Sequence, residues 1–100
     1  MERHAGEAAR LMKAMSNAKR LLILCQLANA ERSVGELATA VGLSQSALSQ
    51  HLASLREAGL VGTRRESQAI FYRLQSRAVT GILEALYQIY CNPNNKEKPI

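Results

Sequence analysis

The two cysteines are the side chains of this 100-residue chain best suited to covalent chemistry. A pair of thiols can respond to an oxidant or a persulfide, because one sulfur reacts and the second resolves the product as a disulfide or a sulfur-bridged polysulfide. A direct disulfide needs the two Cα atoms within about 7 Å, so the fold would have to bring Cys25 and Cys91 together. The alternative is packing: free cysteine is among the most buried residue types, and the leucines around Cys25 would let it fill the core.

Metal binding is the other chemistry open to these thiols. A tetrahedral zinc site needs about four ligands, which two cysteines do not supply within one protomer. The chain's only histidines, His4 and His51, are poor candidates. We therefore predict no metal site and no cofactor. A soft metal or arsenite, held by the cysteines with help across a dimer, stays open as the alternative. We also predict no enzyme, since no nucleophile–base pair or carboxylate dyad stands at a recognisable spacing.

The segment 33–60 predicts a helix-turn-helix, in which one helix braces another inside a DNA groove. Ser33 can cap the first helix, and Glu36, three residues on, completes a capping box. Gly42 ends that helix, because glycine tolerates the left-handed conformation that helix ends often need. Ser44 then caps the second helix. Two local start signals and one stop signal thus place both helices.

The second helix of this motif has a polar face suited to a DNA groove. At about 100° per residue, its leucines fall on the opposite side. A glutamine amide can bond adenine through two atoms, and a serine hydroxyl can bond a base edge or a phosphate. The side chains expected to contact DNA are Ser44, Gln45, Ser46, Ser49 and Gln50. His51 falls on the inner half of the helix, so we expect it to pack or to bond a phosphate.

A β-hairpin is predicted directly after this helix. The run VGTRRE is extended, Ser67-Gln68 can turn the chain, and AIFYRL returns with β-branched and aromatic residues. A hairpin in this position is a wing. Arg64 and Arg65 lie near its tip, where they could reach phosphates or a minor groove.

Helical patterns also flank the motif. Residues 5–15 and 18–28 predict two helices before it, and residues 77–91 predict a broad apolar helix after it. So small a chain has little core left to cover the first and last helices, so we expect them to pair with a second copy. Twin recognition helices would then read half-sites about one helical turn, ~10 bp, apart. A monomer with a self-contained core is the alternative.

The predicted architecture is therefore mainly α with a small β-hairpin. Residues 1–91 form one winged helix-turn-helix domain for DNA binding and dimerisation, and residues 92–100 are expected to be a flexible tail.

Net charge fits a binder of phosphate backbones. Lysine and arginine number 13 against 8 aspartates and glutamates, which gives +5, although this balance also suits acidic partners or membrane surfaces. A winged-helix module that binds protein instead of DNA is an alternative of another class, against which the basic hairpin and polar helix face argue. The longest apolar run, Leu21 to Cys25, is far below the roughly 20 residues that a membrane span needs. We therefore expect no membrane partner and a cytoplasmic protein.

Taken together, these segments resemble the ArsR/SmtB family of winged-helix repressors. The resemblance covers Leu11 to Cys91 and is carried by LMKAMSNAKRLLIL, SVGELA, LSQSALSQHLASLREAGLV and TRRESQAIFYRL. It implies a homodimer that occupies double-stranded operator DNA and blocks transcription until an inducer is sensed. It also implies major-groove contacts from the exposed face of the second motif helix and wing contacts from the two arginines. The residues so assigned are Gln45, Ser46, Ser49, Gln50, Arg64 and Arg65.

The resemblance also bears on the inducer. Many members hold metal or arsenic with cysteines in the helix before the recognition helix, and others hold zinc with Asp and His on the last helix. Here VGELATAV has no Cys, His or Asp, and the last helix offers only Glu84 as a carboxylate. One cysteine in the second helix and one at the end of the last is similar to the BigR/SqrR/HlyU branch, whose members sense persulfides or oxidants through such a pair. Cys25 and Cys91 are thus implied as a redox-sensing pair.

Overall fold

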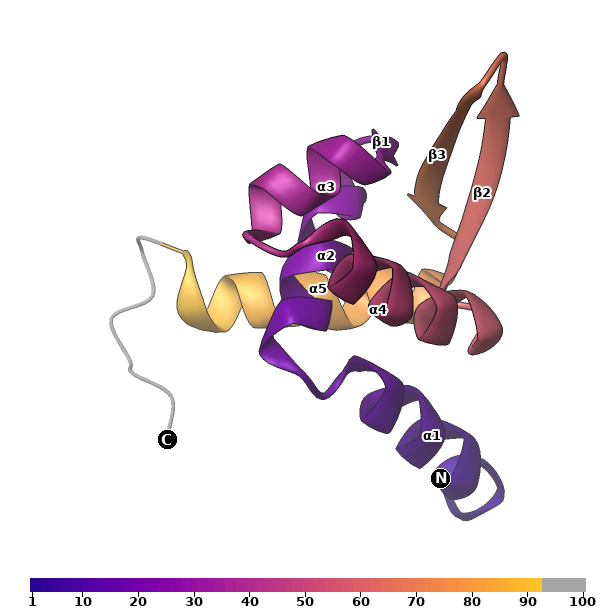
Figure 1. The fold of residues 1–100 in the computed structure, drawn as a ribbon. Helices are drawn as coiled ribbons and strands as arrows, with labels where there is room; N and C mark the ends of the chain where they lie inside the picture. Colours follow the sequence, from indigo (N-terminus) through magenta and orange to yellow (C-terminus); the bar gives the residue numbers. More distant parts are fainter. Residues whose placement is uncertain (93–100) are drawn as a thin grey trace.

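The computed structural model describes residues 1–92 and contains five α-helices and a small antiparallel sheet (Figure 1). The predicted tail lies, from residue 93 on, outside the described residues. The elements run in the order η1 (Glu2–His4), α1 (Ala5–Met15), α2 (Ala18–Asn29), β1 (Arg32–Ser33), α3 (Val34–Val41), α4 (Gln45–Glu57), β2 (Val61–Glu66), β3 (Ala69–Leu74) and α5 (Arg77–Tyr90). The winged helix-turn-helix architecture predicted from the sequence is confirmed.

Side-chain caps begin four of these helices. Ser33 forms the predicted capping box: its hydroxyl accepts from the Glu36 backbone N–H, and the Glu36 carboxylate accepts from the Ser33 N–H. The pKa of Glu36 is lowered, because hydrogen bonds from Ser33, first from its backbone and second from its side chain, stabilise the carboxylate. Gly42 ends α3 in the left-handed region at φ 69°. The other side-chain caps are Asn17 for α2, Ser44 for α4 and Ser76 for α5.

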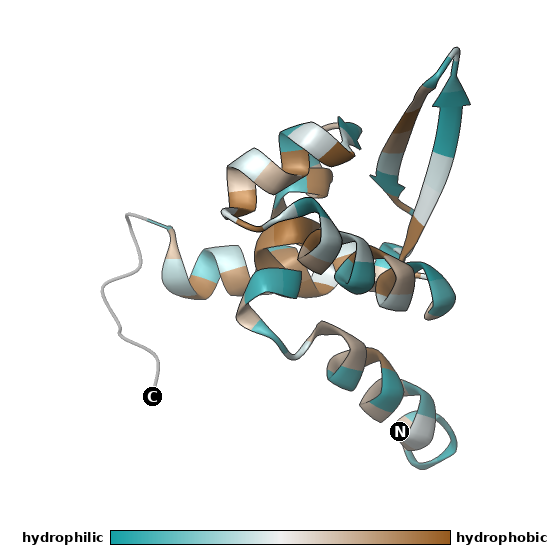
Figure 2. Ribbon diagram, in the orientation of Figure 1, coloured by the Kyte–Doolittle hydropathy of each residue, from teal (hydrophilic) through white to brown (hydrophobic). Residues whose placement is uncertain are grey.

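One hydrophobic core joins α2, α3, α4, α5 and the base of the hairpin. The brown segments of Figure 2 turn toward this centre, while the outer half of β2 is teal. The buried core residues are Met15, Ile23, Leu24, Leu27, Leu37, Val41, Leu48, Leu52, Leu55, Leu60, Val61, Val79 and Leu83. Within the described part of the chain, no buried side-chain polar atom lacks a hydrogen-bond partner.

The sheet has a third strand that the sequence did not predict. The strand order is β1-β3-β2, and β3 pairs with β2 along its whole length. The added strand, β1, pairs antiparallel with β3 through only two residues, Arg32 opposite Tyr72 and Ser33 opposite Phe71. Two residues carry too little alternation to indicate a strand. Because Ser33 also caps α3, this short pairing joins the hairpin to the start of the helix-turn-helix.

Helix α1 and the C-terminal part of α5 extend away from this core (Figure 1). Met15 is the only buried residue of α1, and in α5 only Val79 and Leu83 are buried. No helix within residues 1–92 is long and apolar enough to cross a membrane.

Replacing the cap of α3 is expected to destabilise the fold. Ser33→Ala removes the hydroxyl that accepts the Glu36 N–H, so the free energy of unfolding should fall by about 1 kcal/mol in urea titrations followed by circular dichroism. Ser49→Ala is the matched control, because this serine is exposed inside α4, where alanine is the better helix former. Equal stability of the two variants would contradict the capping role.

Candidate DNA-binding surface and cysteine pair

The recognition helix α4 is oriented by its inner face. Leu48, Leu52 and Leu55 are at most 1% exposed, and each buried leucine stabilises the fold by about 1.5–3 kcal/mol. The side chains predicted to contact DNA are all exposed: Ser44, Gln45, Ser46, Ser49 and Gln50. The Ser44 hydroxyl already accepts from the Ala47 N–H as the helix cap. The Ser46 hydroxyl lies 3.4 Å from the Ser44 hydroxyl, within hydrogen-bond reach. The contacts of these side chains with bases stay a prediction.

A side chain of α2 binds the turn between α3 and α4. The Lys19 ammonium donates to the Val41 carbonyl at 2.6 Å, beside Gly42. This bond satisfies a carbonyl at the end of α3 and places a positive charge where helix C-termini favour one. It therefore fixes the turn on which the angle between the two motif helices depends.

His51 lies where the helical wheel predicted, on the inner half of α4, and it is half-buried. Its Nδ1 accepts a hydrogen bond from Arg20 Nε at 3.1 Å, and Arg20 Nη1 donates to the Ala14 carbonyl at 3.1 Å. His51 thus joins α4 to α2, and it does not belong to the exposed polar face.

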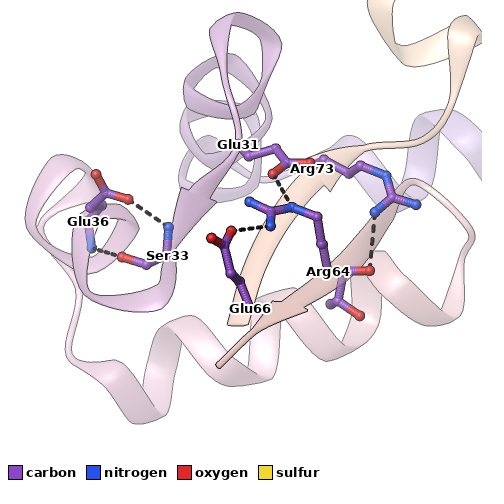
Figure 3. A network of polar contacts seen from close by, with 7 residues as sticks. Glu31, Ser33, Glu36, Arg64, Glu66 and Arg73 are labelled. Atoms are coloured by element: carbon purple, nitrogen blue, oxygen red, sulfur yellow. Dashed lines mark hydrogen bonds and ion pairs between the residues drawn. The ribbon is translucent and has the colours of Figure 1, made fainter. Parts of the chain in front are cut away.

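The two wing arginines have different surroundings. Arg65 is exposed, and the structure gives its side chain no ion pair within residues 1–92. Arg64 Nε donates to Glu31 Oε1 at 2.8 Å, and its Nη1 donates to Glu66 Oε2 (Figure 3). These bonds raise the pKa of Arg64, chiefly through Glu66 and then through Glu31. The predicted role of both arginines in DNA binding stays a prediction.

Sequence reasoning missed the partners of Arg64. Glu66 could have been found, because strand alternation puts residues two apart on the same face. Glu31 could not, since its contact depends on the two-residue pairing of β1 with β3. Arg73 was also missed: its Nη1 donates to the Thr63 carbonyl at 3.1 Å across the hairpin.

Both cysteines are exposed free thiols, so the interpretation of Cys25 as core filling is wrong. Ile23 and Leu24 are buried, but Cys25 lies on the outer side of α2, as does Leu22, which is 48% exposed. The pKa of the Cys25 thiol is raised, first by partial burial and second by the negative charge of a Cys91 thiolate. The fold therefore brings Cys25, in the second half of α2, near enough to Cys91, directly after α5, for the charge of one sulfur to act on the other.

A pocket of about 350 Å³ opens beside Cys25, between α2 and α5. It is lined by Cys25, Ala28, Asn29, Thr80, Leu83, Glu84 and Tyr87. A small reagent can therefore approach the Cys25 sulfur from solvent. Among residues 1–92, no group of three or more His, Cys, Asp or Glu side chains is placed to hold a metal ion.

A helix-turn-helix with an exposed polar second helix, followed at once by a β-hairpin, defines the class of winged helix-turn-helix DNA-binding proteins. A profile described as bacterial regulatory protein, arsR family, matches residues 17–63. The chain is also 53% identical to the transcriptional activator HlyU of Vibrio cholerae, over 94% of this chain and 87% of that protein. The chain therefore belongs to the ArsR family of transcriptional regulators.

Solved structures agree with this assignment. Reduced HlyU from Vibrio cholerae superposes with a TM-score of 0.87 at 53% identity, covering 92% of this chain and 97% of that one. The transcriptional repressor BigR from Xylella fastidiosa superposes with a TM-score of 0.87 at 46% identity, covering 92% of this chain and 94% of BigR. The homodimeric winged helix-turn-helix DNA-binding domain of Mb0332 from Mycobacterium bovis superposes with a TM-score of 0.73 at 39% identity. The match covers 84% of this chain and 77% of that domain.

The raised pKa of Cys25 predicts a slow thiol whose reactivity depends on Cys91. Alkylation of Cys25 by iodoacetamide should rise with pH along a curve displaced above that of free cysteine, because only the thiolate reacts. In Cys91→Ser the curve should move to lower pH, since the neighbouring negative charge is gone. Site-resolved mass spectrometry from pH 6 to about pH 10 measures both curves, a range that spans the ordinary thiol pKa. A Cys25 curve that Cys91→Ser leaves unmoved would contradict the electrostatic contact.

Proposed function

We propose that this protein is a cytoplasmic repressor that binds operator DNA as a homodimer and releases it when Cys25 and Cys91 are linked. The observation that carries DNA binding is the exposed polar face of α4, set outward by its buried leucines. Gln45, Ser46, Ser49 and Gln50 would enter the major groove, and the wing would lie against the phosphate backbone. The net charge of +5 favours association with DNA.

Dimerisation is supported by apolar surface that one protomer leaves uncovered. An apolar groove between α1, α2 and α5 is lined by Met12, Met15, Ser16, Leu21, Ile82 and Leu86. Met12 is 54% exposed and Tyr90 is 66% exposed. Helices α1 and α5 of a second copy would cover these side chains, and the homodimeric domain of Mb0332 is a precedent within the fold.

The proposed switch begins with thiol chemistry at the cysteine pair. One thiolate attacks the outer sulfur of a persulfide RSSH, which forms a protein persulfide and releases RS⁻. The second thiolate attacks the protein-bound sulfur of that persulfide, which forms a Cys25–Cys91 disulfide and releases HS⁻. The two thiols are oxidised and the outer sulfur is reduced to sulfide. A longer bridge would need a second RSSH, so that both cysteines become persulfides. The terminal sulfur of one would then attack the protein-bound sulfur of the other, forming a trisulfide and releasing HS⁻.

A link between the cysteines would act on the dimer through α5. Cys25 belongs to α2 inside the DNA-binding body, whereas Cys91 ends α5, which carries the proposed dimer contacts. Joining them would pull α5 toward α2 and so change the spacing of the two recognition helices. Because half-site spacing is a geometric requirement of a dimer on DNA, operator affinity would fall.

Base recognition is tested by comparing specific with non-specific DNA. Gln45→Ala and Ser49→Ala should weaken binding to an operator fragment selected from genomic DNA by about 1–3 kcal/mol each, and should change binding to random duplex much less. Arg65→Ala is the control, because loss of a phosphate contact should weaken both about equally. Fluorescence anisotropy at fixed salt measures the affinities. Equal losses on both duplexes from the α4 variants would reject base recognition.

The switch is tested with single cysteine variants. Cys25→Ser and Cys91→Ser should bind the operator as the wild type does when reduced, but should keep it after treatment with an organic persulfide. Intact mass spectrometry of the wild type should show the loss of two hydrogens or an added sulfur bridge. If persulfide released either variant from the operator, the paired-thiol switch would be refuted. A mass increase from bound zinc or arsenite would instead favour metal sensing.

A further inference from the structure

Arg64 crosses the whole sheet of the wing. In the register, Arg64 of β2 lies opposite Phe71 of β3, and Phe71 lies opposite Ser33 of β1. The guanidinium carbon stands 4.9 Å from the centre of the Phe71 ring, and beyond that ring it reaches Glu31, just before β1. Figure 3 shows this side chain between Glu31 and Glu66, next to the Ser33–Glu36 capping box.

The neighbours of this guanidinium neutralise the positive charge that could otherwise attract a DNA phosphate. The guanidinium Nε binds Glu31 and its Nη1 binds Glu66. The guanidinium also lies over the ring of Phe71. A guanidinium is planar, and its fixed fork of donors suits such a combination of two carboxylates and an aromatic ring. Two negative charges and one positive charge sum to −1, so this cluster does not attract a phosphate. Arg65, one residue on, points to the other face of the strand, away from both carboxylates.

The same contacts join the wing to the rest of the domain. Residues 64–70, the outer part of the hairpin, are all exposed, so packing does not fix their direction. Glu31 lies in the connection between α2 and β1, and two residues later Ser33 caps α3. The Glu31–Arg64 ion pair therefore spans from the outer hairpin to the point where the helix-turn-helix begins. It supplements the two-residue pairing of β1 with β3.

We propose that Arg64 is a positioning residue, which braces the wing against the start of α3 and leaves Arg65 as the wing's phosphate contact. The inference rests on the proposed DNA binding for its purpose, but the brace itself exists in the free protein. A wing held in its bound direction loses less conformational freedom when DNA arrives, so the brace raises affinity without touching DNA.

The brace is tested first without DNA. Amide hydrogen exchange of residues 62–73 should be about two- to fivefold faster in Arg64→Ala and in Glu31→Gln than in the wild type, as expected for loss of exposed ion pairs. The double variant should be no faster than Arg64→Ala alone, because both changes break one interaction. Arg65→Ala, which changes the neighbouring arginine that has no ion pair among residues 1–92, should exchange at the wild-type rate. Unchanged exchange in both Arg64→Ala and Glu31→Gln would overturn the brace.

Binding of a random DNA duplex across a range of potassium chloride concentrations then separates the brace from a phosphate contact. The slope of log affinity against log salt should fall by about one per protomer in Arg65→Ala and should stay unchanged in Arg64→Ala. Glu31→Gln should weaken binding relative to Glu57→Gln, a matched loss of one exposed negative charge at the end of α4. If Arg64 contacted phosphate, Glu31→Gln would free its charge and tighten binding.

These outcomes distinguish the inference from the function on which it rests. Tighter binding by Glu31→Gln, or a lower slope in Arg64→Ala, would overturn the positioning role even if DNA binding holds. A wild-type protein that bound neither operator nor random duplex would refute the proposed function, and the exchange rates would still decide whether Arg64 braces the wing.

Discussion

The burial of one row of leucines on α4 determines what the rest of the molecule can offer to DNA. Leu48, Leu52 and Leu55 are packed into the core, so the helix cannot rotate without exposing apolar surface. Their burial turns the serines and glutamines of the opposite face outward. Every other constraint on this helix, including the Ser44 cap and the His51–Arg20 hydrogen bond, adjusts a direction that the leucines have already set.

Features that depend on local spacing could be predicted from the sequence, and features that depend on tertiary contact could not. The capping box of Ser33 and Glu36 involves residues three apart, so it is visible in the order of side chains. The exposure of Cys25 was not visible, because the leucines beside it say only that one side of α2 is buried. The strand β1 and the Glu31–Arg64 ion pair arise only after segments distant in sequence come together.

The cysteine pair lies outside the helix-turn-helix, and this separation shapes any control through it. A sensor within α3 or α4 would alter the surface that contacts DNA, whereas Cys25 lies on the outer side of α2 and Cys91 follows the end of α5. The raised pKa of the Cys25 thiol keeps it mostly protonated, which slows its reaction with general oxidants. Under the proposed function, a link between the two cysteines would act on DNA binding by moving α5 and not by altering α4.

In the wing, strand geometry gives two neighbouring arginines different surroundings. Arg64 and Arg65 have equal charge, yet alternation along β2 sends them to opposite faces of the hairpin. One face holds Phe71, Glu66 and the approach to Glu31, which together fix a guanidinium. The other face has no such partners within residues 1–92, so its arginine keeps its charge for a ligand. A basic pair in a sequence is therefore not two equivalent DNA contacts, because the carboxylates of the fold decide which cation is used internally.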